Sequence, residues 1–448
     1  MNSATRLFSA CVVTALTGTL FAGCGSGTSI GATHVAPTPA ATNGPGGAPT
    51  ASSNPTATGT SVPTPSSAPT ATSAPTLAAT ATPSATPVPP PAGGTSSASI
   101  YLGDIAQGAV LIYSSNANGK VSPSAIIAGS NTGFTDSAGS SQIYGIAVDE
   151  TGTVYVLTQT VDSTGTTIAA ESILAFPAGT TGNVAPARTI SLPTSIDAES
   201  LAYSASNLYV TDQSGTGAID VYASSATGFV SPLRTFTDST PFPNLPLKVS
   251  VDASGNTYVA TNDQTATAAT EATQGVYEFS NTANGMTATE NTTAGSNTGF
   301  ESGVLEAAVI DAGGTLDGVV QDATTDTTAD IDEFASGATG NATPTITFAD
   351  TSSQGPIDAA VDAARNLYVS EVANSSQYAQ VNVFGPGTKT PQQTIEAYEG
   401  ELPLIAIGPY VATSPSGQMQ VSLHEMSARK KSVLRKGLHE RALRIRLR

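Results

Sequence analysis

The chain has 448 residues, only 11% of them charged, and a formal net charge of −18. Nine of its sixteen Lys and Arg residues lie in Leu423–Arg448, together with two glutamates. The rest of the chain therefore carries seven basic and 32 acidic residues, a net charge of −25. A body this acidic repels the phosphates that dominate nucleic-acid affinity, so the composition excludes a nucleic-acid partner.

Cysteine and histidine are nearly absent. The two cysteines are Cys11 and Cys24, and the three histidines are His34, His424 and His439, all outside the region that we predict to fold. A Ser-His-Asp or Cys-His mechanism needs an imidazole base, and ordinary zinc sites use His or Cys ligands. Both are therefore excluded from the folded region, and what remains is carboxylate chemistry, with or without a hard cation.

Residues 1–23 have the pattern of a secretory signal peptide. Arg6 supplies the positive charge, and the mostly apolar run that follows, Leu7–Ala22, is too short for a comfortable membrane span. The run leads into Cys24, and the small residues before it resemble a bacterial lipobox, although Phe21 stands where Leu is usual. We therefore expect lipidation at Cys24, which would anchor the chain in a membrane. The alternative is a plain signal peptide.

Residues 24–98 read as a disordered linker. No Asp, Glu, Lys or Arg occurs between Leu7 and Gly103, and fourteen of the 29 prolines lie between Pro37 and Pro91. Such a segment cannot bury enough apolar surface to offset its ordering entropy. We expect an extended stalk that lifts the next domain off the membrane.

Residues 99–423 contain a repeat. Ala360–Val369 reads as two short strands joined by a polar turn, and it recurs as Ala147–Val156 and Ser250–Val259, with a looser copy at Leu201–Val210. In the three close copies, an Asp and a Tyr lie six residues apart. The heptapeptide Ala-Gly-Ser-Asn-Thr-Gly-Phe also occurs twice, from Ala128 and from Ala294.

A third strand in each repeat ends in an aromatic residue that has a Gly six positions later. These glycines are Gly119, Gly182, Gly228, Gly285 and Gly340. Four of the five aromatic residues also have a Pro ten positions later, namely Pro123, Pro186, Pro232 and Pro344. We interpret the Gly as the positive-φ residue of a hairpin turn and the Pro as the start of an outer strand.

Repeats of about 54 residues with four strands are typical of propeller blades. The region has room for six blades, so we predict an all-β, six-bladed β-propeller after the disordered stalk. The first unit lacks its first strand, and we expect Leu404–Ile407 to supply it and close the ring. The alternative is a seven-bladed ring, with Tyr410–Val411 and Met419–Val421 in a truncated seventh blade.

The Ala-Val-Asp, Asn-Leu-Tyr-Val and aromatic-strand pattern resembles NHL-repeat propellers and the related six-bladed SMP-30/gluconolactonase-like group. The resemblance covers roughly Ile100–Leu423, with two departures: Asp317 replaces the Tyr that should follow Asp311, and Tyr203 stands where an Asp is expected. It implies a propeller and raises the hypothesis of a calcium-dependent hydrolase, because that group holds a divalent ion with Glu, Asn and Asp.

Candidate binding residues are the acids just after the second strand of each repeat. They are Asp104, Asp212, Asp263, Asp322 and Glu371. If they converge at the channel mouth, their oxygens would suit Ca²⁺; the alternative is that they cap hairpins. The Asp of each Ala-Val-Asp is interpreted as a turn residue that accepts backbone N–H groups. The acids from Asp322 to Glu333 are interpreted as an exposed hairpin loop.

Residues 424–448 form a basic tail, read either as a solvated tail or as an amphipathic helix. The sequence thus favours a monomeric bacterial lipoprotein of the cell envelope. Its propeller, facing the periplasm or the exterior, would serve as a binding or scaffold module for a protein or glycan ligand. The alternatives are the calcium-dependent hydrolase and a structural or adhesive envelope component.

Overall fold

A computed structural model describes residues 98–105, 107–134, 141–161, 168–238, 245–262, 274–322, 328–350, 353, 355–372, 379–397 and 403–409. The signal peptide, the stalk, Cys24, Asp263 and the basic tail lie outside these residues. In the part that is described, the only helix is a 3-10 turn, η2 (Phe300–Ser302).

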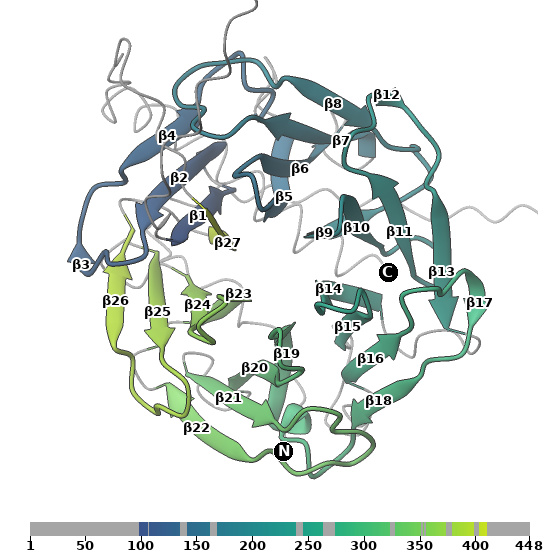
Figure 1. Cartoon of the computed structure of the whole chain (residues 1–448), viewed down its shortest axis with the longest axis vertical. Coiled ribbons are helices and arrows are strands. Elements are labelled where there is room, and N and C mark those ends of the chain that lie inside the picture. Colours follow the sequence, from purple (N-terminus) through teal and green to yellow (C-terminus); the bar gives the residue numbers. More distant parts are fainter. Residues whose placement is uncertain are drawn as a thin grey trace, which may run out of the picture. The chain divides into compact units, whose positions relative to one another are not determined.

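Six sheets, each with four antiparallel blade strands, are arranged in a ring (Figure 1), which confirms the six-bladed propeller. The strands of each blade are given from the innermost outward. Blade 1 consists of β27 (Pro403–Pro409), β1 (Ala98–Asp104), β2 (Ala109–Ser114) and β4 (Ala125–Ala128), and blade 2 of β5 (Ser141–Val148), β6 (Val154–Val161), β7 (Ile168–Phe176) and β8 (Arg188–Ser191). Blade 3 consists of β9 (Ala198–Ser204), β10 (Asn207–Asp212), β11 (Ala218–Ala223) and β13 (Arg234–Asp238).

The other three blades follow the same order. Blade 4 consists of β14 (Leu245–Val251), β15 (Thr257–Asn262), β16 (Gly275–Phe279) and β18 (Asn291–Ala294). Blade 5 consists of β19 (Gly303–Ile310), β20 (Leu316–Asp322), β21 (Ala329–Phe334) and β22 (Ile346–Asp350). Blade 6 consists of β23 (Pro356–Val361), β24 (Leu367–Glu371), β25 (Gln380–Phe384) and β26 (Gln393–Glu396).

The ring is closed by strand β27, which pairs antiparallel with β1 from Ala98↔Pro409 to Asp104↔Pro403. This confirms the predicted role of Leu404–Ile407. It also brings the start of β1 and the end of β27 to the same face of the ring. The residues proposed for a seventh blade lie outside the described part of the chain.

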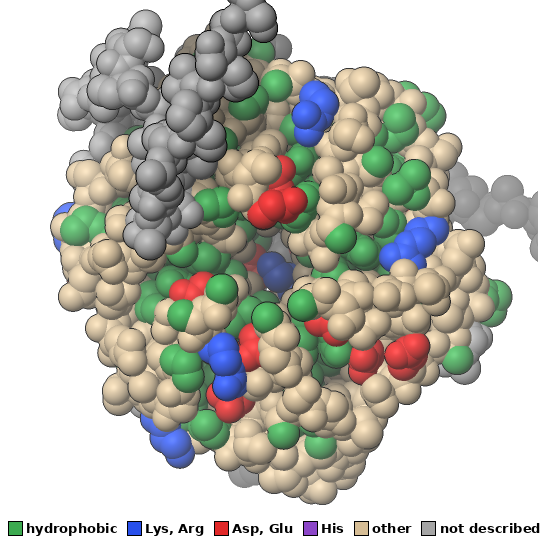
Figure 2. Space-filling view, viewed as in Figure 1, with side chains coloured by type: hydrophobic (Ala, Val, Ile, Leu, Met, Phe, Trp, Pro, Cys, Tyr) green, Lys and Arg blue, Asp and Glu red, His purple; other side chains and the backbone are tan. Residues whose placement is uncertain are grey.

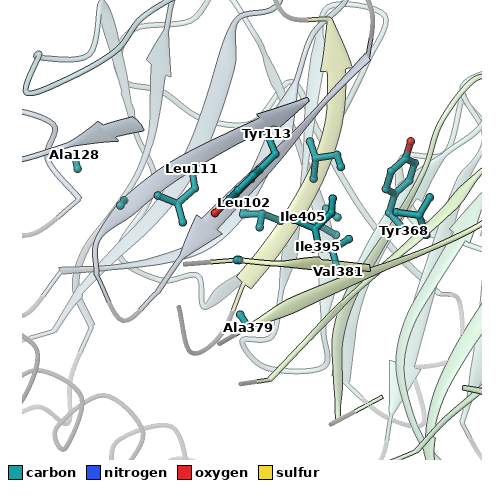
Figure 3. Packing of buried hydrophobic residues seen from close by; sticks show 13 residues of the cluster. Leu102, Leu111, Tyr113, Ala128, Tyr368, Ala379, Val381, Ile395 and Ile405 are labelled. Atoms are coloured by element: carbon teal, nitrogen blue, oxygen red, sulfur yellow. The ribbon is translucent and has the colours of Figure 1, made fainter. Parts of the chain in front are cut away.

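The hydrophobic core is divided among the blade interfaces. Each of six buried clusters contains residues from two neighbouring blades. Figure 3 shows the cluster at the ring closure, where Tyr113 and Leu111 of blade 1 and Ile405 of the closing strand lie near Tyr368 and Val381 of blade 6. No blade can bury its apolar faces alone, so ring closure is needed for a complete core.

The aromatic residues that end the third strands also hold neighbouring blades together. Phe279 packs on Phe236 of the preceding blade with ring centroids 5.2 Å apart, and Phe384 packs on Phe348 at the same distance. Both ring pairs are tilted by about 55°, a favourable arrangement for aromatic side chains.

The five repeated glycines have the predicted positive φ angles, between 66° and 81°. Their role is wider than a hairpin turn, because each also pairs, in parallel, with the outer strand of the preceding blade. Gly119, Gly228 and Gly285 begin the short strands β3 (Gly119–Lys120), β12 (Gly228–Phe229) and β17 (Gly285–Thr287). Gly182 and Gly340 form single bridges. A belt of backbone contacts therefore links successive blades at the rim.

We expect Gly182→Ala to lower the free energy of unfolding by about 1–2 kcal/mol, since the new side chain must adopt a left-handed conformation. The φ of Gly182 is +81°, and a methyl group added there would meet no atom within 4 Å, so strain in the backbone is the whole effect. Urea unfolding measures the change, and Gly340→Ala should match it because φ (+66°) and the open space are alike. If both variants were as stable as wild type, the positive φ at these positions would not require glycine.

Candidate functional site at the channel mouth

The strands define two faces of the ring. The mouth face is the one at which the second strands end, at Asp104, Asp212, Asp322 and Glu371. The turn face is the opposite one, where a turn joins the first and second strands in blades 2 to 6 and where β1 starts and β27 ends in blade 1. Four of the five predicted acids therefore share one face, although they belong to four different blades, and Asp263 lies outside the described residues.

Two of these acids accept hydrogen bonds from residues of their own blades. Asp104 Oδ1 accepts the backbone N–H of Gln107 at 3.1 Å. Glu371 is fully buried and accepts the side-chain amides of Gln380 at 2.5 Å and Asn382 at 3.0 Å. Asn382 also donates to Asp350 at 2.7 Å. Among the described residues, no group of three or more His, Cys, Asp or Glu side chains could hold a metal ion.

Hydrogen bonds join several acids at the mouth face in the junction cluster, which we define as Glu171, Asp197, Asp212 and Gln159 at the boundary of blades 2 and 3. The Gln159 amide donates to Glu171 Oε1 at 2.8 Å and to Asp197 Oδ1 at 3.3 Å. The backbone N–H of Asp197 in turn donates to Asp212 Oδ1 at 2.9 Å. The Gln159 side-chain amide and the Asp197 backbone N–H thus link three buried carboxyls through hydrogen bonds.

Glu171 is the most deeply buried carboxyl of this cluster. Its side chain is 2% exposed. Its Oε1 also accepts the Ala198 N–H at 2.9 Å, whereas no residue in the described part of the chain donates a hydrogen bond to its Oε2. Burial, with a smaller contribution from the Asp197 and Asp212 charges, raises the pKa of Glu171 to about 7. Burial also raises the pKa of Asp212.

We expect these buried carboxyls to make the protein less stable as the pH rises from about 4.5 to 7. The pKa of Glu171 is raised to about 7, and burial together with the Glu333 and Asp311 charges raises the pKa of Asp317 to about 7. The folded state therefore binds the two protons more tightly than the unfolded chain. That stabilisation is complete below the unfolded pKa of about 4 and is lost as the pH passes through the folded values.

Urea midpoints at pH 5 and pH 8 test this pH dependence. Glu171→Gln and Asp317→Asn should each flatten it by an amount on the order of 1–3 kcal/mol, because each removes one titration. The lowered pKa values of Asp149 and Asp311 act in the opposite direction but only below about pH 4, so they do not affect this window. A pH dependence that is unchanged in both variants would contradict the assignment.

The central channel is crossed by an ion pair that the repeat pattern did not predict. Lys248 of β14 lies 2.5 Å from Asp358 of β23, so the pair joins blade 4 to blade 6. Asp358 also accepts the backbone N–H groups of Ala359 at 2.8 Å and Ile405 at 3.1 Å. Figure 2 shows a basic side chain in the central hollow with acidic side chains near it. In the sequence, Lys248 and Asp358 occupy equivalent positions, each four residues before the Asp of its repeat, and this equivalence could have indicated the pair.

The Asp of each close repeat has the turn role that the sequence predicted. On the turn face, Asp362 Oδ1 accepts the backbone N–H groups of Ala364 and Asn366, both at 2.9 Å, and Asp311 accepts those of Gly313 and Thr315. In the same way, Asp149 and Asp252 each accept two backbone N–H groups.

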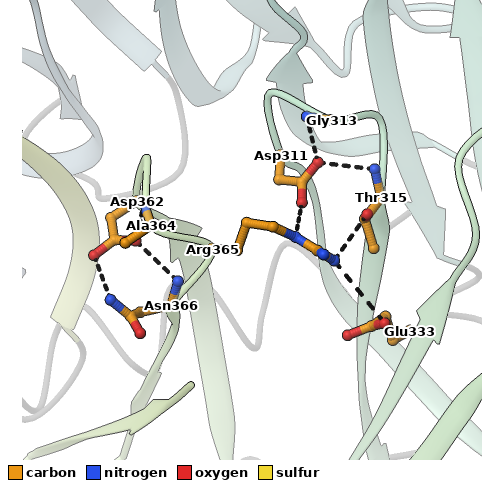
Figure 4. Close-up of polar contacts among 8 residues, drawn as sticks. All are labelled: Asp311, Gly313, Thr315, Glu333, Asp362, Ala364, Arg365 and Asn366. Carbon is orange, nitrogen blue, oxygen red and sulfur yellow. Dashed lines mark hydrogen bonds and ion pairs between the residues drawn. The ribbon is translucent and has the colours of Figure 1, made fainter. Parts of the chain in front are cut away.

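In blade 5, Arg365 takes the place of the missing Tyr. Tyr368 donates to Asp362 at 3.0 Å within blade 6. In blade 5, where Asp317 replaces the Tyr, the guanidinium of Arg365 reaches across from blade 6 to Asp311 and Thr315 (Figure 4). The interpretation of the acids from Asp322 to Glu333 as an exposed loop is wrong for Asp332, which lies within β21 and is buried, with its carboxylate accepting the Thr347 hydroxyl. Asp326 of the same group lies outside the described residues.

Comparisons with known proteins find only distant similarities to solved structures. No family model and no curated protein matches the chain. A protein of unknown function from Bacteroides caccae is 9% identical, covering 70% of this chain and 99% of its own, with a TM-score of 0.45. A gluconolactonase from Xanthomonas campestris is 13% identical over 58% of this chain and 76% of its own, with a TM-score of 0.36.

A neuraminidase-like protein of a flat-faced bat influenza virus is 12% identical over 60% of this chain and 78% of its own, with a TM-score of 0.38. These distant similarities do not assign an activity. Within the described residues, no helix is long and apolar enough to cross a membrane.

Proposed function

We propose that this protein is a bacterial lipoprotein of the cell envelope that presents its propeller as a ligand-binding module. The observation that carries the proposal is the position of the chain ends. β1 starts and β27 ends at the turn face, where Ala98 pairs with Pro409. A stalk that enters at Ala98 would hold the ring by its turn face and leave the mouth face directed away from the anchor.

The stalk and the predicted lipid complete the proposal. The segment between Cys24 and Ala98 has the composition of an extended linker, with a reach of tens of ångströms. A diacyl anchor at Cys24 would hold it firmly on a membrane, since each buried methylene contributes about 0.8 kcal/mol. A buried ion pair in the channel and carboxyls held by hydrogen bonds favour a rigid binding platform over a catalyst.

Metabolic labelling with an alkyne-modified palmitate tests the tether. The wild-type chain should be labelled and should sediment with membranes after cell lysis. Cys24→Ser should remove the label and release the protein, whereas Cys11→Ser serves as the matched control and should still be processed and labelled. Equal labelling of wild type and Cys24→Ser, or no labelling of either, would contradict the proposal.

A further inference from the structure

Three large apolar side chains are exposed on the outer rim of the ring. Phe229 is 72% exposed, Leu233 65% and Met286 74%. Phe229 lies in β12 and Met286 in β17, and both strands are on the outside of the ring (Figure 1). Leu233 directly precedes β13, beside which β17 runs in parallel. We call these three residues the rim patch. Side chains this exposed add little to the core, and together they indicate an interaction surface.

The other blades show that the fold does not require apolar residues at this part of the rim. Phe229 and Met286 each follow one of the five repeated glycines directly. At the same position, blades 2 and 5 have Asn183 and Asn341, whose Oδ1 atoms accept backbone N–H groups of the preceding blade at 2.7 and 2.6 Å. Blade 1 has Lys120 there. The belt of backbone contacts therefore does not explain the two exposed apolar side chains of blades 3 and 4.

Net charge decides which occupant fits the rim patch. Outside the basic tail, the chain carries seven basic and 32 acidic residues, so a second propeller and an anionic lipid surface would both be repelled. The basic tail, residues 424–448, holds nine basic residues and two glutamates, a net charge of +7. It also contains Leu434, Leu438 and Ile445, which recur at the spacing of one helical face. The tail thus matches both the charge of the ring and the apolar character of the patch.

Two glutamates add local charge complementarity beside the patch. Glu278 lies near the start and Glu290 at the end of the link that contains Met286, and the Glu290 N–H donates to the Glu278 carbonyl at 2.8 Å. The Glu278 carboxylate accepts the Tyr258 hydroxyl at 2.9 Å and the Asn291 amide at 2.7 Å, both neutral donors. The ion pairs found among the described residues involve neither glutamate, so both can attract a cationic segment.

The arginine next to Leu233 does not neutralise these glutamates. Arg234 is half-buried and donates to the Ala283 carbonyl at 2.8 Å. Its Cζ lies 5.4 and 5.9 Å from the centroids of two aromatic rings of blade 3. Arg234 is therefore held at the interface of blades 3 and 4.

We propose that the rim patch holds the chain's own basic tail, with the Leu434, Leu438 and Ile445 side chains against the patch. This inference goes beyond the proposed function and does not depend on it. The 25 residues from Pro409, where β27 ends, to Leu434 can span about 80 Å when extended. The rim lies about four strand spacings, roughly 20 Å, from the innermost strand, so the tail can reach it. Docking there covers the exposed apolar surface and brings a positive segment to an acidic ring.

Photo-crosslinking in the full mature chain carrying Cys24→Ser tests the docking without the lipid. The crosslinking residue p-benzoylphenylalanine replaces Phe229 or, as a control, Lys389, which is exposed in blade 6. In a mixture of 15N-labelled and unlabelled protein, we expect position 229 to crosslink to residues 427–448 of the same molecule, and position 389 to do so at least tenfold less. Crosslinks between labelled and unlabelled chains, equal yields at the two positions, or no crosslink to the tail would overturn the proposal.

Trypsin cleavage measures how strongly the tail is held, because lysines and arginines in a docked segment are protected. Phe229→Ser with Met286→Ser should raise the rate of cleavage within residues 427–448 at least fivefold. The matched pair Ala335→Ser with Thr343→Ser changes exposed residues in the corresponding link of blade 5 and should alter the rate less than twofold. All four side chains are exposed, so we expect both variants to fold. Equal cleavage rates in the two variants would show that the rim patch does not hold the tail.

Discussion

Replacing Lys248 with methionine will lower the free energy of unfolding by about 3–5 kcal/mol. The change removes the positive partner of Asp358, whose side chain is 6% exposed, while Lys248 itself is 13% exposed. The carboxylate would then be buried with two backbone donors but no compensating charge. Most of the destabilisation comes from this isolated charge, since methionine retains the apolar length of the lysine side chain.

The double variant Lys248→Met with Asp358→Asn separates the charge effect from general damage to the channel. We expect it to recover a large part of the lost stability, because the amide stays in place of the carboxylate without leaving a charge. Urea unfolding at pH 7 measures wild type and both variants. A Lys248→Met protein as stable as wild type would show that the ion pair does not hold blades 4 and 6 together.

Replacing Arg365 with alanine will destabilise the ring by about 1–2 kcal/mol, and replacing it with glycine will cost about 1 kcal/mol less. Arg365 has a φ of +66°, whereas the corresponding positions in three other repeats are Gly152, Gly255 and Gly314. Arginine therefore adopts a backbone conformation that favours glycine. Both substitutions lose the ion pair with Asp311, but only glycine also relieves the strain.

The modest destabilisation expected for Arg365→Ala follows from the solvent exposure of the arginine side chain. The Arg365 side chain is 45% exposed and the Asp311 side chain 1%, so solvent screens part of the attraction. Thermal unfolding of Arg365→Ala, Arg365→Gly and the exposed control Lys389→Ala would give the ranking. If Arg365→Gly were more stable than wild type, the ion pair between blades would contribute less than the strain that it imposes.

The repeat made the fold predictable because each blade depends on short-range patterns. The Asp turns and the positive-φ glycines follow from residues within one repeat. The closing strand follows from the number of strands, because the first unit lacks its first strand. The same periodicity placed Asp104, Asp212, Asp322 and Glu371 at one face.

The partners of the mouth residues could not be predicted in this way, because they belong to different blades or strands. Gln159 reaches Asp197 across 38 positions, and Lys248 reaches Asp358 across 110. These contacts depend on how the blades are stacked around the channel. The burial of Glu171 depends equally on its neighbour Ala198, which donates its N–H from the next blade.

Maleimide labelling of single cysteines on membrane vesicles tests the proposed orientation of the ring most directly, since it reports which face is directed away from the anchor. In the Cys11→Ser chain, we predict that a cysteine replacing Thr216 at the mouth face reacts with a bulky maleimide faster than one replacing Ser254 in a turn at the opposite face, each rate being compared with that of the released Cys24→Ser chain. Equal rates at both positions, or a faster reaction at Ser254, would contradict the claim that the propeller presents its mouth face away from its tether.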